Sequence, residues 1–163
     1  MTKKELTISY VEFNNPEELS NEDSALFAAA EKAISKAYAP YSHFKVGAAV
    51  LLENGEVITG NNQENAAYPS GLCAERVALF YASSIFPDIP VKTIAISAKA
   101  ENFQFKGPVA PCGSCRQVMA ETETRFKNKL KIIMMGDKGA VQIMEGVDTI
   151  LPFMFHADEL KKH

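Results

Sequence analysis

The sequence predicts an α/β fold: a three-layer α/β/α domain around a mixed five-stranded sheet. Three observations carry this prediction. Segments with apolar residues at helical spacing alternate with short apolar runs along the 163 residues. Turn residues (Asn-Gly, Pro and Gly) separate the segments. Several runs are apolar throughout, which is typical of strands covered by helices on both faces.

Composition and charge narrow the class of protein. The chain is 47% hydrophobic and 23% charged, which indicates a folded protein, and its length fits one domain. A net charge of −3 offers no general surface for a nucleic acid polymer. There is no apolar run near the ~20 residues of a membrane span, and Met1–Glu5 does not resemble a signal peptide. We therefore expect a cytoplasmic protein with no membrane partner.

The first half predicts an extension, a helix and a hairpin. Residues 1–19 form an N-terminal extension, either an edge strand or an extended arm, because apolar and polar residues alternate weakly within its first fifteen positions. The domain, 20–163, begins with a helix that Ser20 caps and Pro40 ends. Two strands follow, joined by the tight turn that Asn54-Gly55 favours. They span 44–52 and 57–60.

The second half predicts alternating helices and strands. In chain order these are a helix from about Cys73 to Phe86, a strand 91–98, a helix from Cys112 to about Arg125, and strands 130–135 and 141–144. Strands separated by helical crossovers are expected to pair in parallel. The last strand follows a four-residue turn, 136–139, and is expected to be antiparallel to its predecessor.

Three cysteines are the most informative feature of the chain. Cys73, Cys112 and Cys115 lie at the predicted starts of two helices. An odd number excludes a disulfide framework that uses every cysteine, and a cytosolic chain keeps its thiols reduced. Cys112 and Cys115 lie one helical turn apart and face the same way. Helix N-termini stabilise thiolates, so two such ends that meet would surround one point with three thiolates.

Three thiolates suit zinc. A structural zinc site has four protein ligands, whereas a catalytic site has three and keeps a position open for water, whose pKa falls to about 7. None of the three histidines stands at metal-ligand spacing to a cysteine. Glu75 is placed to handle protons of that water, and Arg76 could form hydrogen bonds to the thiolates. Taken singly, a residue such as Glu75 is more often an acid that interacts with the helix dipole, and one such as Arg76 is more often part of a surface ion pair.

Two motifs resemble the zinc-dependent cytidine deaminases. They are CAER at 73–76 and PCGSCRQ at 111–117, and the cysteine at 73 is similar to the short homotetrameric type. Three further segments resemble that type: 41–49, 62–68 and 151–155. The resemblance covers about three quarters of the chain, from Tyr38 to Phe155.

The resemblance implies a chemistry and a ligand set. Cys73, Cys112 and Cys115 would hold one zinc ion per subunit, and Glu75 would carry protons. The reaction would be hydrolytic deamination of cytidine and 2′-deoxycytidine to the uridines, with release of ammonia, in pyrimidine salvage. Arg76 would form hydrogen bonds to the thiolates that hold the zinc.

The resemblance also implies substrate-binding residues and a homotetramer with active sites at subunit interfaces. Phe44 would lie against the pyrimidine, Ala74 would offer a backbone N–H to the base, and Asn62 and Glu64 would bind the 3′-hydroxyl. The remaining members of the predicted set are Asn65, Ala66, Tyr68 and Phe155, of which the last three would reach across a subunit boundary. Core packing is the alternative for Phe44 and Phe155, and ordinary packing for Tyr68.

Other functions stay open at this point. A blasticidin-S-type deaminase shares the cysteine motifs, although the Asn62-x-Glu64-Asn65 loop and Gln117 argue against it. A non-catalytic zinc or redox module predicts a fourth protein ligand or a reversible disulfide. A catalytically inactive relative is disfavoured by the presence of Glu75.

Overall fold

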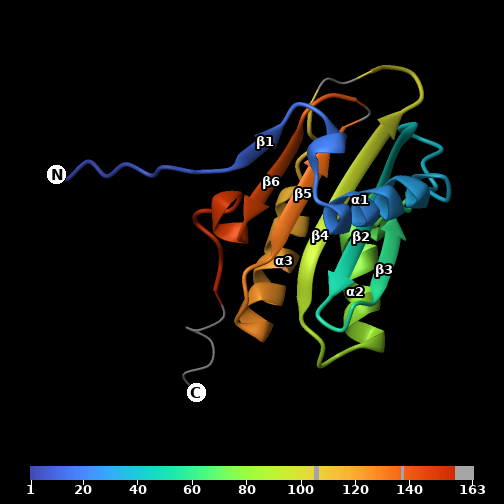
Figure 1. Ribbon diagram of the computed structural model, residues 1–163. Helices are drawn as coiled ribbons and strands as arrows, with labels where there is room; N and C mark the ends of the chain where they lie inside the picture. Colours follow the sequence, from blue (N-terminus) through green and yellow to red (C-terminus); the bar gives the residue numbers. More distant parts are fainter. Residues whose placement is uncertain (105–106, 137, 157–163) are drawn as a thin grey trace.

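The fold is a mixed sheet covered by helices on both faces, as predicted (Figure 1). The computed structural model describes residues 1–104, 107–136 and 138–156. Its helices are α1 (Asn21–Ile34), α2 (Ala74–Ile85) and α3 (Gly113–Phe126). Its strands are β1 (Val11–Phe13), β2 (Phe44–Leu52), β3 (Val57–Asn61), β4 (Val91–Ala100), β5 (Lys131–Met135) and β6 (Val141–Glu145). Ser20 caps α1 as predicted, because its Oγ accepts the N–H of Asp23 at 3.1 Å.

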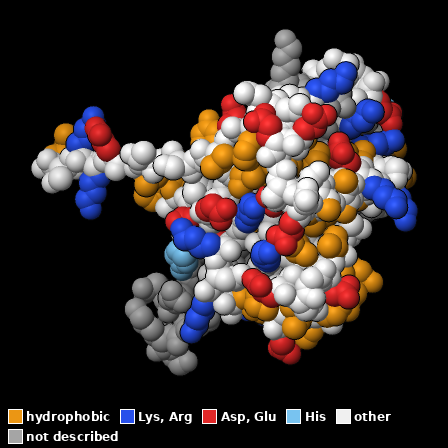
Figure 2. All heavy atoms as spheres, in the orientation of Figure 1, with side chains coloured by type: hydrophobic (Ala, Val, Ile, Leu, Met, Phe, Trp, Pro, Cys, Tyr) orange, Lys and Arg blue, Asp and Glu red, His pale blue; other side chains and the backbone are white. Residues whose placement is uncertain are grey.

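The sheet has six strands where the sequence predicted five, in the order β1-β6-β5-β4-β2-β3. The additional strand is β1, from the N-terminal extension, which pairs antiparallel with the edge of β6. Residues 1–10 continue from it as an extended arm that leaves the body of the molecule (Figures 1 and 2). The turn predicted at 136–139 includes Asp137, and the predicted domain includes 157–163; these residues lie outside the described ranges.

One pairing prediction was wrong. β3 and β4 are separated by the crossover helix α2, yet they do not pair, because β2 lies between them and is antiparallel to both. β2 is buried from Gly47 to Leu52, whereas Val57 and Thr59 of β3 are exposed, so the hairpin turns β3 out to the edge. β4 and β5 do pair in parallel across α3, and β5 and β6 are antiparallel, as predicted.

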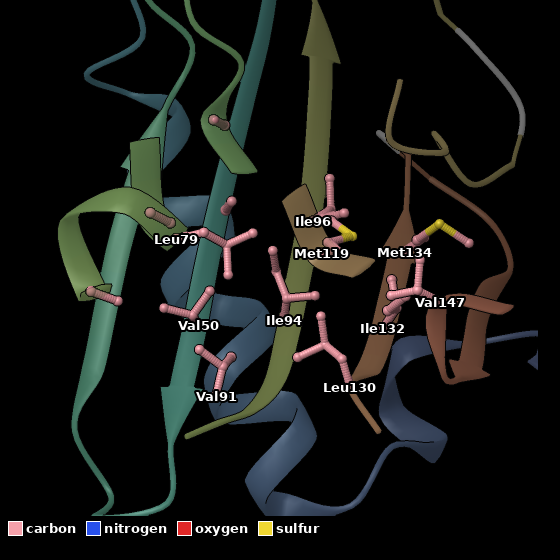
Figure 3. Close-up of a cluster of buried hydrophobic side chains, with 14 of the residues drawn as sticks. Val50, Leu79, Val91, Ile94, Ile96, Met119, Leu130, Ile132, Met134 and Val147 are labelled. Carbon is pink, nitrogen blue, oxygen red and sulfur yellow. The ribbon is translucent and has the colours of Figure 1, made fainter. Parts of the chain in front are cut away.

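The core has one cluster on each face of the sheet. The face that carries α2 and α3 buries Val50, Leu79, Ile94 and Met119 (Figure 3), and the face that carries α1 buries a second set. The second set includes Phe27, Ala49, Leu51, Ala95 and Ile133. Successive strand residues point to opposite faces, so the even-numbered residues of β2, beginning with Phe44, face α2 and α3.

This arrangement brings the first residues of two helices together at one edge of the sheet, the edge formed by the ends of the strands rather than by an outer strand. β3 and β4 run in the same direction because both are antiparallel to β2, so their carboxyl ends lie at the same edge. α2 follows β3, α3 follows β4, and β2 begins at that edge. Ligand sites form beyond the carboxyl ends of strands in α/β sheets.

Gly60 allows α2 to lie close against β3. A Cβ atom at this position would lie 2.5 Å from the backbone oxygen of Ala74 and 2.6 Å from the backbone nitrogen of Ala78. We expect Gly60→Ala to lower the free energy of unfolding by about 1–3 kcal/mol, because the helix must move outward. Denaturant titration measures this. Gly113→Ala is the matched control, since its Cβ would meet no described atom within 4 Å; equal stability of the two variants would contradict the packing argument.

Candidate metal centre and active site

The three predicted cysteines meet at this edge of the sheet. Cys73 is the N-cap of α2, and Cys112 is the N-cap of α3, with Cys115 in its first turn. The Sγ atoms of Cys73 and Cys112 lie 3.8 Å apart, those of Cys112 and Cys115 lie 3.6 Å apart, and all three lie within 4.8 Å of one another. Sulfur atoms about 2.3 Å from a tetrahedral zinc lie about 3.8 Å apart. The donor set and its spacing therefore fit zinc.

The alternatives to a three-cysteine site find no support in the described residues. The three thiols are free, and their separations far exceed the ~2.05 Å of a disulfide bond. Within the described ranges, the cluster of potential metal ligands contains these cysteines and no histidine or carboxylate. Cys115 is buried and Cys112 is exposed, so the cluster opens to the surface on one side.

Positive charge and helix starts favour thiolates at this position. Nη2 of Arg76 lies 3.6 Å from Sγ of Cys73. A hydrogen bond from Cys115, together with those from Arg76 and Cys112, lowers the pKa of Cys73 to about 5. The same hydrogen bond to Cys73, with burial, raises the pKa of Cys115, which keeps the shared proton. The leading N–H groups of α2 and α3 add partial positive charge.

Glu75 is a buried acid in the first turn of α2, only 5% exposed. Burial raises the pKa of its carboxyl group, and the negative charge of Cys73 raises it further. Ala74, beside it, is completely buried at the start of the helix. A carboxyl group held in this way next to a metal centre is suited to carrying protons.

Phe44, Asn62 and Glu64 are joined by a hydrogen-bond network. The Asn62 side chain accepts the N–H of Val46 at 2.8 Å and donates to the carbonyl of Phe44 at 2.9 Å. The Glu64 carboxylate accepts the Ser42 hydroxyl at 2.5 Å and the backbone N–H groups of Tyr41 and Ser42. The Ser42 hydroxyl also accepts the N–H of Phe44. These bonds, the Ser42 hydroxyl first, lower the pKa of Glu64, so its carboxylate stays ionised.

The remaining predicted residues lie on the surface of the single chain. Tyr68 is 90% exposed and Phe155 is 66% exposed, and Asn65 and Ala66 are also exposed. Asn65 shapes its own loop, since its Oδ1 accepts the N–H of Ala67 at 2.8 Å. The structure therefore groups the cysteines with Glu75 and Arg76, and leaves these four facing solvent.

Two residues without a predicted role join the C-terminal segment to the metal centre. Arg116, directly after Cys115, donates to the carbonyls of Pro111 and Ile150, both at 2.7 Å. Gln117 donates to the carbonyl of Phe155 at 2.9 Å. Their place in the second cysteine motif was the only signal for them in the sequence.

Comparison with known proteins identifies the family. Residues 20–128, which contain all three cysteines and Glu75, match the family model described as the cytidine and deoxycytidylate deaminase zinc-binding region. The chain belongs to this deaminase family. A cytidine deaminase of Halalkalibacterium halodurans is 43% identical over 124 residues, which are 76% of this chain and 86% of that protein. One of Sporosarcina psychrophila is 41% identical over 136 residues, 83% of this chain and 92% of that protein.

Solved structures of the deaminase family share the fold. The crystal structure of the cytidine deaminase from Burkholderia pseudomallei is 40% identical and aligns with a TM-score of 0.71, over 84% of this chain and 100% of that one. The family is zinc-binding, and the Cys73, Cys112 and Cys115 cluster accounts for its zinc in this chain.

Arg76 should hold the cysteines of the deaminase site in place for the metal. Its Nε is buried without a hydrogen-bond partner among the described residues, which fits a site that holds a further group. We expect Arg76→Ala to weaken zinc binding about 10- to 100-fold, because the Cys73 sulfur loses its charged donor. Competition with a chromogenic chelator measures the apparent Kd. Arg76→Lys keeps the charge but lacks the planar guanidinium group, so its apparent Kd should lie between those of the parent protein and Arg76→Ala. An unchanged Kd in both variants would contradict this role.

Proposed function

We propose that this protein is a zinc-dependent cytidine deaminase that hydrolyses cytidine and 2′-deoxycytidine to uridine and 2′-deoxyuridine with release of ammonia. The observation that carries the proposal is the buried Glu75 carboxyl group in the helix turn that Cys73 begins, with the sulfur atoms of Cys112 and Cys115 beside it. The relatives named cytidine deaminase support the substrate class. The reaction suits pyrimidine salvage.

Glu75 is the proton carrier in this mechanism. Cys73, Cys112 and Cys115 would hold the zinc ion, which would supply a Lewis acid that lowers the pKa of the attacking water. Glu75 takes a proton from that water as the oxygen adds to C4 of the base, and passes the proton to N3. Glu75 then takes the remaining proton of the added hydroxyl group, as the C4=O bond forms, and delivers it to the amino group, which leaves as ammonia. The balance is one water consumed for each cytidine, with uridine and ammonia formed.

The other residues bind and orient the nucleoside. The backbone N–H of Ala74 donates to the base, and the ring of Phe44 lies against the pyrimidine. Asn62 and Glu64 bind the 3′-hydroxyl of the sugar; each retains lone pairs or hydrogens beyond those used in the network around Phe44. This arrangement accepts both the ribose and the deoxyribose nucleoside.

The site favours a free nucleoside over a polynucleotide. A 3′-phosphate would place a second negative charge beside the ionised Glu64 and would lose the donor of the 3′-hydroxyl. On the face in Figure 2, acidic and basic side chains are interspersed, without the basic stripe that phosphate contacts require. Within the described ranges, every helix is too short or too polar to cross a membrane.

The active chain is proposed to be a homotetramer in the cytoplasm. α2 exposes a row of large apolar side chains, Phe80, Tyr81 and Ile85, of the kind that subunit interfaces cover. Tyr68 and Phe155 are large side chains exposed in the single chain, which supports the expectation that they, with Ala66, reach the site of a neighbouring subunit. Three free thiols and a zinc site suit a reducing compartment.

A substrate comparison tests the proposed function. Ultraviolet absorbance follows the loss of the cytosine chromophore with four compounds: cytidine, deoxycytidine, cytidine 3′-monophosphate and blasticidin S. We expect turnover of both nucleosides, and at least a tenfold lower kcat/KM for the 3′-phosphate, equivalent to about 1.4 kcal/mol. Turnover of blasticidin S without turnover of cytidine would contradict the proposed function and indicate an antibiotic deaminase. If none of the four compounds is turned over, the proposed function is wrong and the non-catalytic zinc-binding module is the alternative that stands.

A further inference from the structure

The loop after β4 contacts Phe44 through residues that the proposed mechanism does not use. Phe103, from this loop, stacks with Phe44: the ring centroids are 6.5 Å apart and the ring planes differ by 16°. Phe44 and Ala100, the last residue of β4, are paired neighbours in the sheet, so the loop leaves β4 beside the ring. The stack therefore joins a substrate-facing residue to a segment nearly sixty positions further along the chain.

Glu101 holds the backbone on both sides of Phe44. One carboxylate oxygen lies 2.6 Å from Nζ of Lys45, and the other lies 3.2 Å from Nδ1 of His43. The backbone N–H of Glu101 also donates to the carbonyl of His43 at 3.1 Å. The charged partner Lys45 lowers the pKa of Glu101, so the carboxylate stays ionised. Both neighbours of Phe44 are thus joined to one side chain.

The backbone at His43 needs such support. His43 has a φ of 54°, in the left-handed region that a residue with a Cβ seldom adopts. Strained conformations of this kind persist where surrounding contacts hold them, and they gather at functional sites. Here the His43 N–H donates to Ala39, and Glu101 contacts both its side chain and its carbonyl. The turn directs the chain into β2 with Phe44 as its first residue.

We propose that Glu101 and Phe103 are positioning residues that set the orientation of the Phe44 ring toward the pyrimidine base. This inference rests on the proposed function, in which Phe44 lies against the base. Phe103 restrains the ring through the stack, and Glu101 restrains the backbone through Lys45 and His43. Loss of either restraint weakens nucleoside binding without removing a group that moves protons.

Kinetics of Phe103→Ala test the effect on substrate. An aromatic pair contributes about 0.5–1.5 kcal/mol, so we expect KM for cytidine to rise about 2- to 10-fold. The value of kcat should stay nearly constant, because a stacked ring contacts the base equally before and in the transition state. Phe103→Tyr should restore KM. Tyr10→Ala is the matched control, since Tyr10 is 51% exposed, close to the 55% of Phe103, and belongs to the N-terminal arm.

A double-mutant cycle separates positioning from direct substrate contact. In a Phe44→Ala background, Phe103→Ala should have no further effect on KM, because the ring that it positions is gone. A full, additive rise in KM would mean that Phe103 binds the nucleoside itself. An unchanged KM in the Phe103→Ala single variant would overturn the inference directly.

Fluorine NMR tests the positioning without relying on turnover. 4-Fluorophenylalanine at position 44 should give one narrow resonance in the otherwise unaltered enzyme. Phe103→Ala and Glu101→Ala should each shift and broaden it, whereas Tyr10→Ala should not. If cytidine is not turned over, the proposed function fails while this resonance still decides whether the loop positions the ring. A resonance that neither variant alters would overturn the positioning role.

Discussion

Replacing Glu75 with glutamine should lower kcat/KM for cytidine by about 10²- to 10⁴-fold, the usual contribution of a general acid–base group. Glutamine has the same shape but carries no titratable proton, and Glu75 is the acid in the turn that Cys73 begins. Because the side chain is buried, the neutral amide should be at least as stable there as the carboxyl group. Steady-state kinetics with metal analysis by atomic emission should show full zinc content beside the lost activity.

Glu31→Gln is the matched control for this prediction. Burial also raises the pKa of Glu31, but it lies on α1, on the opposite face of the sheet from α2 and α3. This variant should keep the activity of the parent enzyme. If Glu75→Gln retained kcat/KM within threefold of the parent, the proton-carrier assignment would be wrong.

Cys115→Ser should abolish stoichiometric zinc binding and activity together. Cys115 is completely buried, and its Sγ lies 3.6 Å from that of Cys112. The two remaining thiolates, those of Cys73 and Cys112, cannot replace it as a zinc ligand. Metal binding is coupled to folding, so we expect the free energy of unfolding to fall by about 3 kcal/mol or more, a drop in Tm of about 6–12 °C. Metal analysis and differential scanning calorimetry measure both effects.

Two further variants keep the second prediction decisive. Cys112→Ser changes an exposed thiol of the same cluster, so zinc loss there cannot be ascribed to a disrupted core. Ser114→Ala changes an exposed residue between the two cysteines and should keep zinc, activity and Tm. A Cys115→Ser protein that binds one equivalent of zinc as tightly as the parent would contradict the three-cysteine site.

Local signals predicted the elements that carry the metal centre. Ser20 begins α1, and both cysteine motifs begin helices as expected, because capping and helical spacing are properties of neighbouring residues. The order of strands was harder to predict. Whether β4 pairs with β3 or β2 depends on which strand is the more buried, and that depends on contacts across the whole sheet.

Contacts between distant residues explain what the sequence did not predict at the site. Glu64 is bonded to Ser42, 22 positions away, and Arg116 to Ile150, 34 positions away. Neither pair has a periodic or motif signal in one sequence. Tyr68 and Phe155 are exposed in the single chain, so their contact with a neighbouring subunit stays a prediction.

Quantification of both products at controlled zinc content is the most direct test of the central claim, which is zinc-dependent deamination of cytidine. Purified protein is incubated with cytidine, and uridine and ammonia are quantified before zinc removal by a chelator, after removal, and after zinc is restored. We expect one uridine and one ammonia per cytidine, activity proportional to zinc up to one ion per chain, and recovery on adding zinc. Full activity in protein shown to contain no zinc, or uridine formed without ammonia, would contradict it.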